Sequence, residues 1–224
     1  MLELDQMSSI IAKCREIGGE GLSNGVKANI PELLVDILVP PFDFLGTGKN
    51  SAIFVNKTTH NLLGQFHENW ILERTIALKE AFLQQAVIIE IIGAIIHETG
   101  HAFNVAAGIP NTETNAHIFE IEVMRKLLAT KSPLLFGCTE VDVQTYFRNR
   151  LSDYNLQIQK NRDNYLVDLV KEIKEQFSLE DDKKSFENAN SQSTWCTLFA
   201  TKQWRKEFDV IMQSCGITPE ARPY

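Results

Sequence analysis

Two histidines four residues apart stand in the stretch IIHETGHAFN, residues 95–104. On an α-helix, residues i and i+4 lie on one face about one turn apart, so His97 and His101 can direct imidazole nitrogens at the same metal ion. Imidazole nitrogens bind zinc at roughly 2 Å. The pattern therefore predicts a metal site, and the competing interpretation is a core helix whose two histidines only pack.

Glu98 lies between these histidines in the chain but is rotated by about 100° from His97 around the helix, so we do not expect it to bind the metal. In this motif the glutamate instead reaches the metal-bound water and acts as a general base. Zinc lowers the pKa of such a water toward about 7, which makes hydroxide accessible at neutral pH. The predicted chemistry is hydrolysis, with the metal polarising a carbonyl and Glu98 moving the proton.

Gly100 occupies the position just before the second histidine. Glycine inside a helix costs about 1 kcal/mol relative to alanine. We therefore expect a neighbouring element to pack closely against the helix at this residue.

A catalytic zinc site needs a third protein ligand and one open position. The residue six positions after His101 is Ala107, which excludes the metzincin ligand pattern. The next predicted helix carries Glu113, His117 and Glu120 at i, i+4 and i+7, on one face. A turn through residues 108–110 would fold this helix back against the first one, and the spacing leaves open which of the three is the ligand.

The sequence HETGHAFN followed by NTETNAHIFEIEVM resembles the gluzincin metallopeptidases, in which a His-Glu-x-x-His helix precedes a helix carrying Glu-x-x-x-Asp. The resemblance covers about residues 90–125 and implies a compact zincin-like fold with Zn²⁺ as cofactor. It implies that Glu113 is the third ligand and that the residue four positions later orients a histidine ligand. That residue is His117 rather than an acid, which departs from the family pattern.

The short spacing from His101 to Glu113 is also similar to that of small His-Glu-x-x-His effector proteases, which bacterial pathogens inject into host cells. This resemblance implies a secreted effector that reaches the host cytosol without a cleavable signal peptide. It also implies a host protein as substrate, for example actin.

Other residues could complete such a site. Asn104 and Asn115 could orient the histidine ligands by hydrogen bonds, which metal-bound imidazoles usually have, although ordinary polar placement is the simpler interpretation of both. A tyrosine, histidine or arginine near the open position would stabilise the oxyanion. The sequence does not choose among the candidates His60, His67, Tyr146, Arg148 and Tyr154.

The elements that must position these residues are mostly helical. We expect helices at 30–41, from 68 onward and over 79–107, a helix that begins at Asn111 or Thr112, helical structure throughout 140–177 and a final helix over 194–215. Residues 52–56 form the one predicted strand, which could line the cleft and pair with an extended peptide. Gly108 followed by Pro110 is a typical helix terminator. Residues 178–193 are charged and polar, which is typical of a solvated connector.

Composition limits the classes of protein to consider. With 224 residues and 44% hydrophobic content, the chain can bury a core, and its net charge of −7 argues against a nucleic-acid partner. Four widely spaced cysteines without a Cys-x-x-Cys pair favour free thiols in a reducing compartment. The start lacks the basic and apolar regions of a signal peptide, and the longest apolar run is far shorter than the about 20 residues of a membrane span. We expect a cytosolic protein.

The sequence thus predicts a mainly α protein with a small β element. We expect a zincin-like catalytic region at 1–135 and a helical region at 136–224 packed on it, unless both form a single domain. The predicted function is a zinc-dependent endopeptidase with Glu98 as base. The alternatives are a catalytically inactive zincin-like module that binds metal or a protein partner, and a helical interaction protein without metal.

Overall fold

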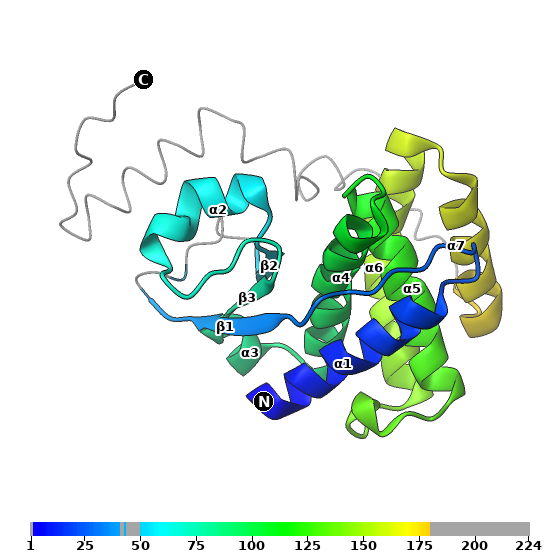
Figure 1. Cartoon of the computed structure of the whole chain (residues 1–224). Helices are drawn as coiled ribbons and strands as arrows, with labels where there is room; N and C mark the ends of the chain where they lie inside the picture. The colour runs from blue at the N-terminus through cyan, green and yellow to red at the C-terminus, as the bar shows by residue number, and fades with distance from the viewer. Residues whose placement is uncertain (1, 41–42, 44–49, 180–224) are drawn as a thin grey trace.

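The computed structural model describes residues 2–40, 43 and 50–179. A three-stranded sheet with helix α2 lies at one end of the molecule, and helices α4 to α7 pack together at the other (Figure 1). The elements follow the order α1 (Leu4–Glu20), β1 (Leu34–Leu38), β2 (Ala52–Phe54), α2 (Lys57–Leu63), η1 (Gly64–Phe66), β3 (Thr75–Lys79), α3 (Glu80–Gln85), α4 (Ile88–Ala107), α5 (Glu113–Ala129), η2 (Pro133–Leu135), α6 (Glu140–Asn161) and α7 (Asn164–Phe177). The predicted class, mainly α with a small β element, is confirmed.

The sheet has the strand order β1-β3-β2, with β3 parallel to β1 and antiparallel to β2. The predicted strand at 52–56 is confirmed as β2, which is an edge strand among the described residues. The helix predicted at 30–41 is wrong, because this segment forms β1. Its β-branched residues Val35 and Ile37 suit a strand, and the residues of β3 that pair with it are 41 positions further along the chain.

The helical pattern expected from residue 68 is wrong over β3. This strand is almost fully buried between its two neighbours, and such strands lack the alternation that distinguishes a strand from a helix in sequence. The single helix predicted over 79–107 is two helices. Ala86 and Val87 have extended backbone angles and separate α3 from α4.

Helix α4 runs through the centre of the molecule and contacts α1, α5, α6, β2 and β3. Fourteen of its 20 residues are buried, including both histidines of the motif. Gly108 ends α4 in the left-handed conformation, as the sequence predicts. Thr112 is the N-cap of α5, with its side chain accepting a hydrogen bond from the amide of Asn115 at 3.3 Å.

The helical stretch at 140–177 is interrupted once. Arg162 adopts a left-handed conformation at the end of α6, and Asp163 caps α7 by accepting a hydrogen bond from the amide of Leu166. Side chains from α1, α4, α5, α6 and α7 share one hydrophobic cluster. The cluster includes residues on both sides of position 135, the predicted boundary between the two regions of the chain. Among the described helices, none has the length and apolar character that crossing a membrane requires. The predicted helix at 194–215 and nearly all of the connector before it lie outside the described residues.

Candidate metal centre

The three residues predicted as metal ligands meet where α4 passes the start of α5. His97 and His101 project from successive turns of α4, and Glu113 is the first residue of α5. The Nε2 atom of His97 lies 3.1 Å from Oε2 of Glu113, and Nε2 of His101 lies 3.4 Å from Oε1 of the same carboxylate. The turn after Gly108 therefore folds α5 back as predicted and brings the carboxylate to both imidazoles.

These distances are short enough for the three side chains to share one ion. Each histidine nitrogen lies beside a different oxygen of the Glu113 carboxylate. One ligand atom from each of His97, His101 and Glu113 can be chosen so that all lie within 4.8 Å of one another. The three side chains could therefore hold one metal ion.

The other ring nitrogen of each histidine is also held. Nδ1 of His97 lies 2.8 Å from Oε2 of Glu120, and Nδ1 of His101 lies 2.7 Å from Oδ1 of Asn111. Such partners fix the ring orientation and the tautomer, leaving Nε2 for the metal, and they are usual around metal-bound histidines. Glu120 is therefore the acid that contacts His97, whereas the resemblance assigned an orienting residue to the position of His117.

Glu120 is completely buried, and five side chains converge on its carboxylate. Oε1 accepts hydrogen bonds from the hydroxyls of Tyr146 at 2.7 Å and Tyr154 at 2.6 Å. Oε2 accepts from the guanidinium of Arg150 at 2.9 Å. The remaining two partners are His97 and His117. We call these six residues the Glu120 cluster.

Glu120 also belongs to a second group of potential ligands, with His97 and His117. The charge of Arg150 argues against a cation there, because the guanidinium already neutralises this carboxylate. Burial alone would raise the pKa of Glu120, but the charge of Arg150 and hydrogen bonds with His117 and His97 hold it well below its usual range. Burial lowers the pKa of His117, so at neutral pH its Nδ1–H donates to Glu120 at 3.0 Å as a neutral imidazole.

Without a metal, a proton takes the place of the cation between His97 and its carboxylates. Burial opposes the charged imidazolium, but hydrogen bonds and charge interactions with Glu113 and Glu120 raise the pKa of His97 to about 10. Burial raises the pKa of Glu113, yet His101 and His97 outweigh this and bring it far below its ordinary value. The two carboxylates therefore favour a positive charge on the ring of His97.

Two glycines of α4 permit the close packing around this centre. A Cβ atom at Gly100 would lie 3.1 Å from the carbonyl oxygen of Ala116 and 3.2 Å from its Cα atom, which confirms the predicted close approach of another element. A Cβ atom at Gly93 would lie 2.2 Å from the hydroxyl of Tyr146. Gly93 thus makes the space in which Tyr146 reaches Glu120.

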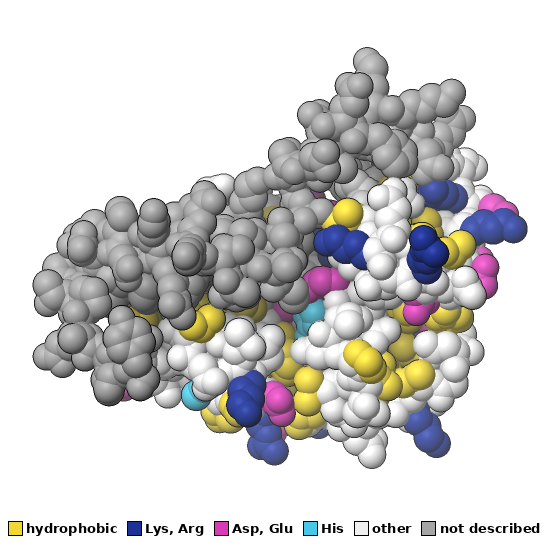
Figure 2. Space-filling view, turned by 90° about the horizontal axis from the view of Figure 1, so that it is seen from above, with side chains coloured by type: hydrophobic (Ala, Val, Ile, Leu, Met, Phe, Trp, Pro, Cys, Tyr) yellow, Lys and Arg dark blue, Asp and Glu magenta, His cyan; other side chains and the backbone are white. Residues whose placement is uncertain are grey.

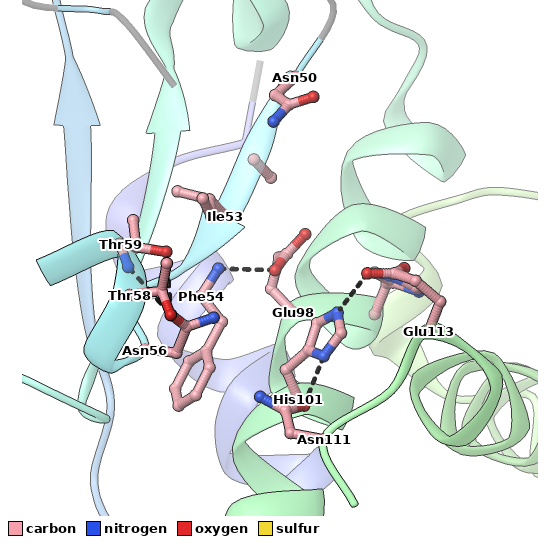
Figure 3. Close-up of a pocket in the computed structure, with 12 residues that line it drawn as sticks. Asn50, Ile53, Phe54, Asn56, Thr58, Thr59, Glu98, His101, Asn111 and Glu113 are labelled. Carbon is pink, nitrogen blue, oxygen red and sulfur yellow. Dashed lines mark hydrogen bonds and ion pairs between the residues drawn. The ribbon is translucent and has the colours of Figure 1, made fainter. Parts of the chain in front are cut away.

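Glu98 lies in the same pocket as the ligand group but does not join it. Its Oε2 atom accepts a hydrogen bond of 2.6 Å from the backbone amide of Phe54 in β2 (Figure 3). This contact directs the carboxylate toward the pocket between β2 and α4. The pocket encloses about 200 Å³ and is lined by Asn50, Ala52, Ile53, Phe54, Asn56, Thr58, Thr59, His97, Glu98, His101, Asn111 and Glu113.

Viewed from above, histidine and acidic side chains reach the surface together near the middle of the molecule (Figure 2). Of the ligand group, the side chain of Glu113 is 12% exposed and those of both histidines about 10%. The site is thus shielded by protein and still accessible from solvent.

The residues predicted to assist the site lie elsewhere. Asn104 is buried and forms no side-chain hydrogen bond with any described residue, and Asn115 donates to the carbonyl of Pro110. The hydroxyls of Tyr146 and Tyr154 bind Glu120 rather than facing the open position. Of the five predicted oxyanion stabilisers, His60, His67, Tyr146, Arg148 and Tyr154, none lines the pocket in the described part of the chain.

Sequence reasoning missed the roles of Asn111 and Arg150. Asn111 is predicted only as a possible helix cap, and the cap is Thr112. Tyr146, Arg150 and Tyr154 repeat every four residues on α6, and this spacing predicts a polar stripe on an otherwise buried helix face. The spacing does not predict which residue the stripe contacts, because Glu120 is on another helix.

Comparison of the chain with protein-family models, with curated proteins and with solved structures found no match. The arguments for function therefore rest on the geometry of the site.

Proposed function

We propose that the protein is a zinc-dependent endopeptidase. The observation that carries this proposal is the meeting of His97, His101 and Glu113 with their ligand atoms within 4.8 Å of one another, and with Glu98 beside them in one pocket. A zinc ion held by these three residues would polarise a peptide carbonyl and lower the pKa of a water molecule. The gluzincin-like arrangement and the zincin-like fold are part of this proposal.

In this proposal Glu98 moves the proton. The hydrogen bond from the amide of Phe54 to its Oε2 supports this role, because it favours a carboxylate that faces the pocket. Glu98 accepts a proton from the water whose oxygen attacks the carbonyl carbon. It then gives that proton to the amide nitrogen as the C–N bond breaks, so the products are a carboxylate and an amine.

The edge strand β2 supports a peptide as substrate. Ser51 and Val55 form backbone hydrogen bonds with β3, so by the alternation of antiparallel pairing Ala52 and Phe54 direct their backbone groups away from the sheet. The amide of Phe54 contacts Glu98 on that side, which places this edge along the pocket. Both backbone groups of Phe54 are already bound, the amide by Glu98 and the carbonyl by the amide of Asn56 at 2.9 Å, so an extended peptide would pair with Ala52 on this edge and present a carbonyl near Glu98.

The test is a comparison of three variants for zinc content and hydrolysis. We expect His97→Ala to lose both, and Glu98→Gln to keep one equivalent of zinc while losing hydrolysis by at least 100-fold. Glu90→Gln, on the first turn of the same helix, is the control and should match wild type. A cell lysate is treated with each protein and new peptide termini are mapped, with purified actin as a separate candidate because of the resemblance to effector proteases. A fully active Glu98→Gln variant would refute the assignment of the base.

One observation favours a second function, a metal-binding module without turnover. Among the described residues that line the pocket, there is no tyrosine or arginine to stabilise an oxyanion. One equivalent of zinc in the purified protein, with no new termini in the lysate and intact actin, would support this alternative.

A further inference from the structure

Asn56 follows the edge strand β2 and is the N-cap of α2. Its Oδ1 atom accepts two hydrogen bonds, from the amide of Thr59 at 3.0 Å and from the hydroxyl of the same residue at 3.2 Å. These two donors determine which end of the Asn56 amide is oxygen. The Nδ2 atom, which carries two N–H donors, must therefore point away from α2.

The direction of this amide is toward the pocket. Asn56 lines the pocket together with Glu98 and His101, and Figure 3 shows its nitrogen on the side that faces α4. No described residue accepts a hydrogen bond from this nitrogen, and the pocket otherwise presents the carboxylates of Glu98 and Glu113. A donor with a fixed orientation is thus aimed into the space where a peptide would lie.

We propose that Asn56 positions the substrate by donating a hydrogen bond from Nδ2 to a main-chain carbonyl of the bound peptide, within two residues of the scissile bond. The inference rests on the proposed endopeptidase function. Asn56 lies two residues after Phe54, whose amide holds Glu98, and the chain turns between them because the amide of Asn56 donates to the carbonyl of Phe54 at 2.9 Å. The donor therefore comes from the segment just beyond the edge strand, while the proposed base and metal ligands come from α4 and α5. This separate origin suits a carbonyl of the peptide next to the scissile bond better than the oxyanion itself.

Asn56→Asp and Asn56→Ser separate this role from helix capping. Asparagine, aspartate and serine are comparable N-caps, so both variants keep an acceptor for the amide of Thr59. Both variants lose the amide donor Nδ2. Asp163→Asn, the matched exchange at the N-cap of α7, is the control for a cap substitution remote from the pocket.

The probe is a synthetic dodecapeptide that spans the strongest cut site mapped in the lysate experiment. We expect Asn56→Ser to raise KM about 2- to 10-fold with kcat nearly unchanged, because one neutral hydrogen bond to the peptide backbone is lost. Asn56→Asp should raise KM further, because a carboxylate then faces the carbonyl. Zinc content and the unfolding midpoint should equal those of wild type in all three variants.

A thioamide scan identifies the carbonyl. Sulfur is a weak acceptor, so one thioamide position should raise KM for wild type and have no further effect in Asn56→Ser. A purely structural role for Asn56 would not single out one peptide position. Unchanged KM in both variants, with wild type active, would overturn this inference alone. Absence of any cut site would overturn the proposed function and the inference with it.

Discussion

Replacing Glu120 by glutamine tests whether the Glu120 cluster supports the metal centre. The exchange keeps the size of the side chain and removes its charge. Arg150, whose side chain is 21% exposed, then keeps only its longer ion pair of 3.5 Å with Asp153, and Nδ1 of His97 loses a charged acceptor. The substitution therefore acts on stability and on metal binding through separate contacts.

Removing one partner of a buried ion pair costs about 3–5 kcal/mol, and the partial exposure of Arg150 places this case near the lower limit. For a chain of this size, about 3 kcal/mol corresponds to a fall of roughly 6–12 °C in the unfolding midpoint. Loss of an outer partner of a ligating histidine lowers metal affinity about 10- to 100-fold. Chelator-treated protein is used for the unfolding measurement, so that weaker metal binding does not contribute to it.

Glu122→Gln is the matched control. Glu122 is two residues away on α5 and accepts hydrogen bonds from Ser23 and Tyr165 near the surface, so this exchange should cost less than about 1 kcal/mol and leave zinc affinity unchanged. The double variant Glu120→Gln with Arg150→Met removes the guanidinium that has lost its buried partner and should regain part of the lost stability. A Glu120→Gln protein with the stability and zinc affinity of wild type would refute the assigned role of Glu120.

Three further predictions concern the packing, the histidine partners and pH. Gly93→Ala should destabilise the fold by about 1–3 kcal/mol, because its Cβ would overlap Tyr146. The control Gly19→Ala, on the exposed side of α1, should stabilise the fold by up to about 1 kcal/mol. Denaturant unfolding measures both variants, and an unchanged free energy of unfolding for Gly93→Ala would contradict the packing argument. Asn111→Ala should weaken zinc binding about 10-fold by freeing the ring of His101, while Asn115→Ala should not, as competition with a chromogenic chelator would show. In metal-free protein the pKa of His97 is raised to about 10, so its contribution to stability is complete below about pH 6.5 and is lost as the pH rises through 10. The unfolding midpoint should therefore fall between pH 7 and 10, and His97→Gln should reduce that fall.

The local parts of the fold and site are the parts that the sequence predicts. His97 and His101 are one turn apart on a helix, and the Gly108 terminator, the Thr112 cap and the edge strand β2 all depend on residues close in the chain. The strands β1 and β3 are missed because each is a short apolar segment whose hydrogen bonds come from a distant partner. A five-residue apolar run does not distinguish a strand from a helix by periodicity.

The two acids of α5 show what the sequence leaves undecided. Glu113 and Glu120 are seven residues apart on one helix face, and spacing alone allows either to be the third ligand. Their surroundings separate them. Glu113 faces the Nε2 atoms of both histidines at the edge of the pocket, while Glu120 is fully buried and already binds a guanidinium and two hydroxyls. A carboxylate so fully satisfied can orient His97 but would have to lose several hydrogen bonds to bind a metal itself.

The guanidinium and the two hydroxyls that bind Glu120 all come from α6, beyond residue 135. The predicted catalytic region at 1–135 contains every proposed metal ligand and the proposed base, but it lacks Tyr146, Arg150 and Tyr154. Without them, Glu120 would keep only His97 and His117 as hydrogen-bond partners and would lose the charge of Arg150, which is the largest of the influences that lower its pKa. A Glu120 carboxylate with fewer partners would hold the imidazole of His97 less firmly. The geometry of the metal centre therefore depends on a helix that contributes no ligand to it.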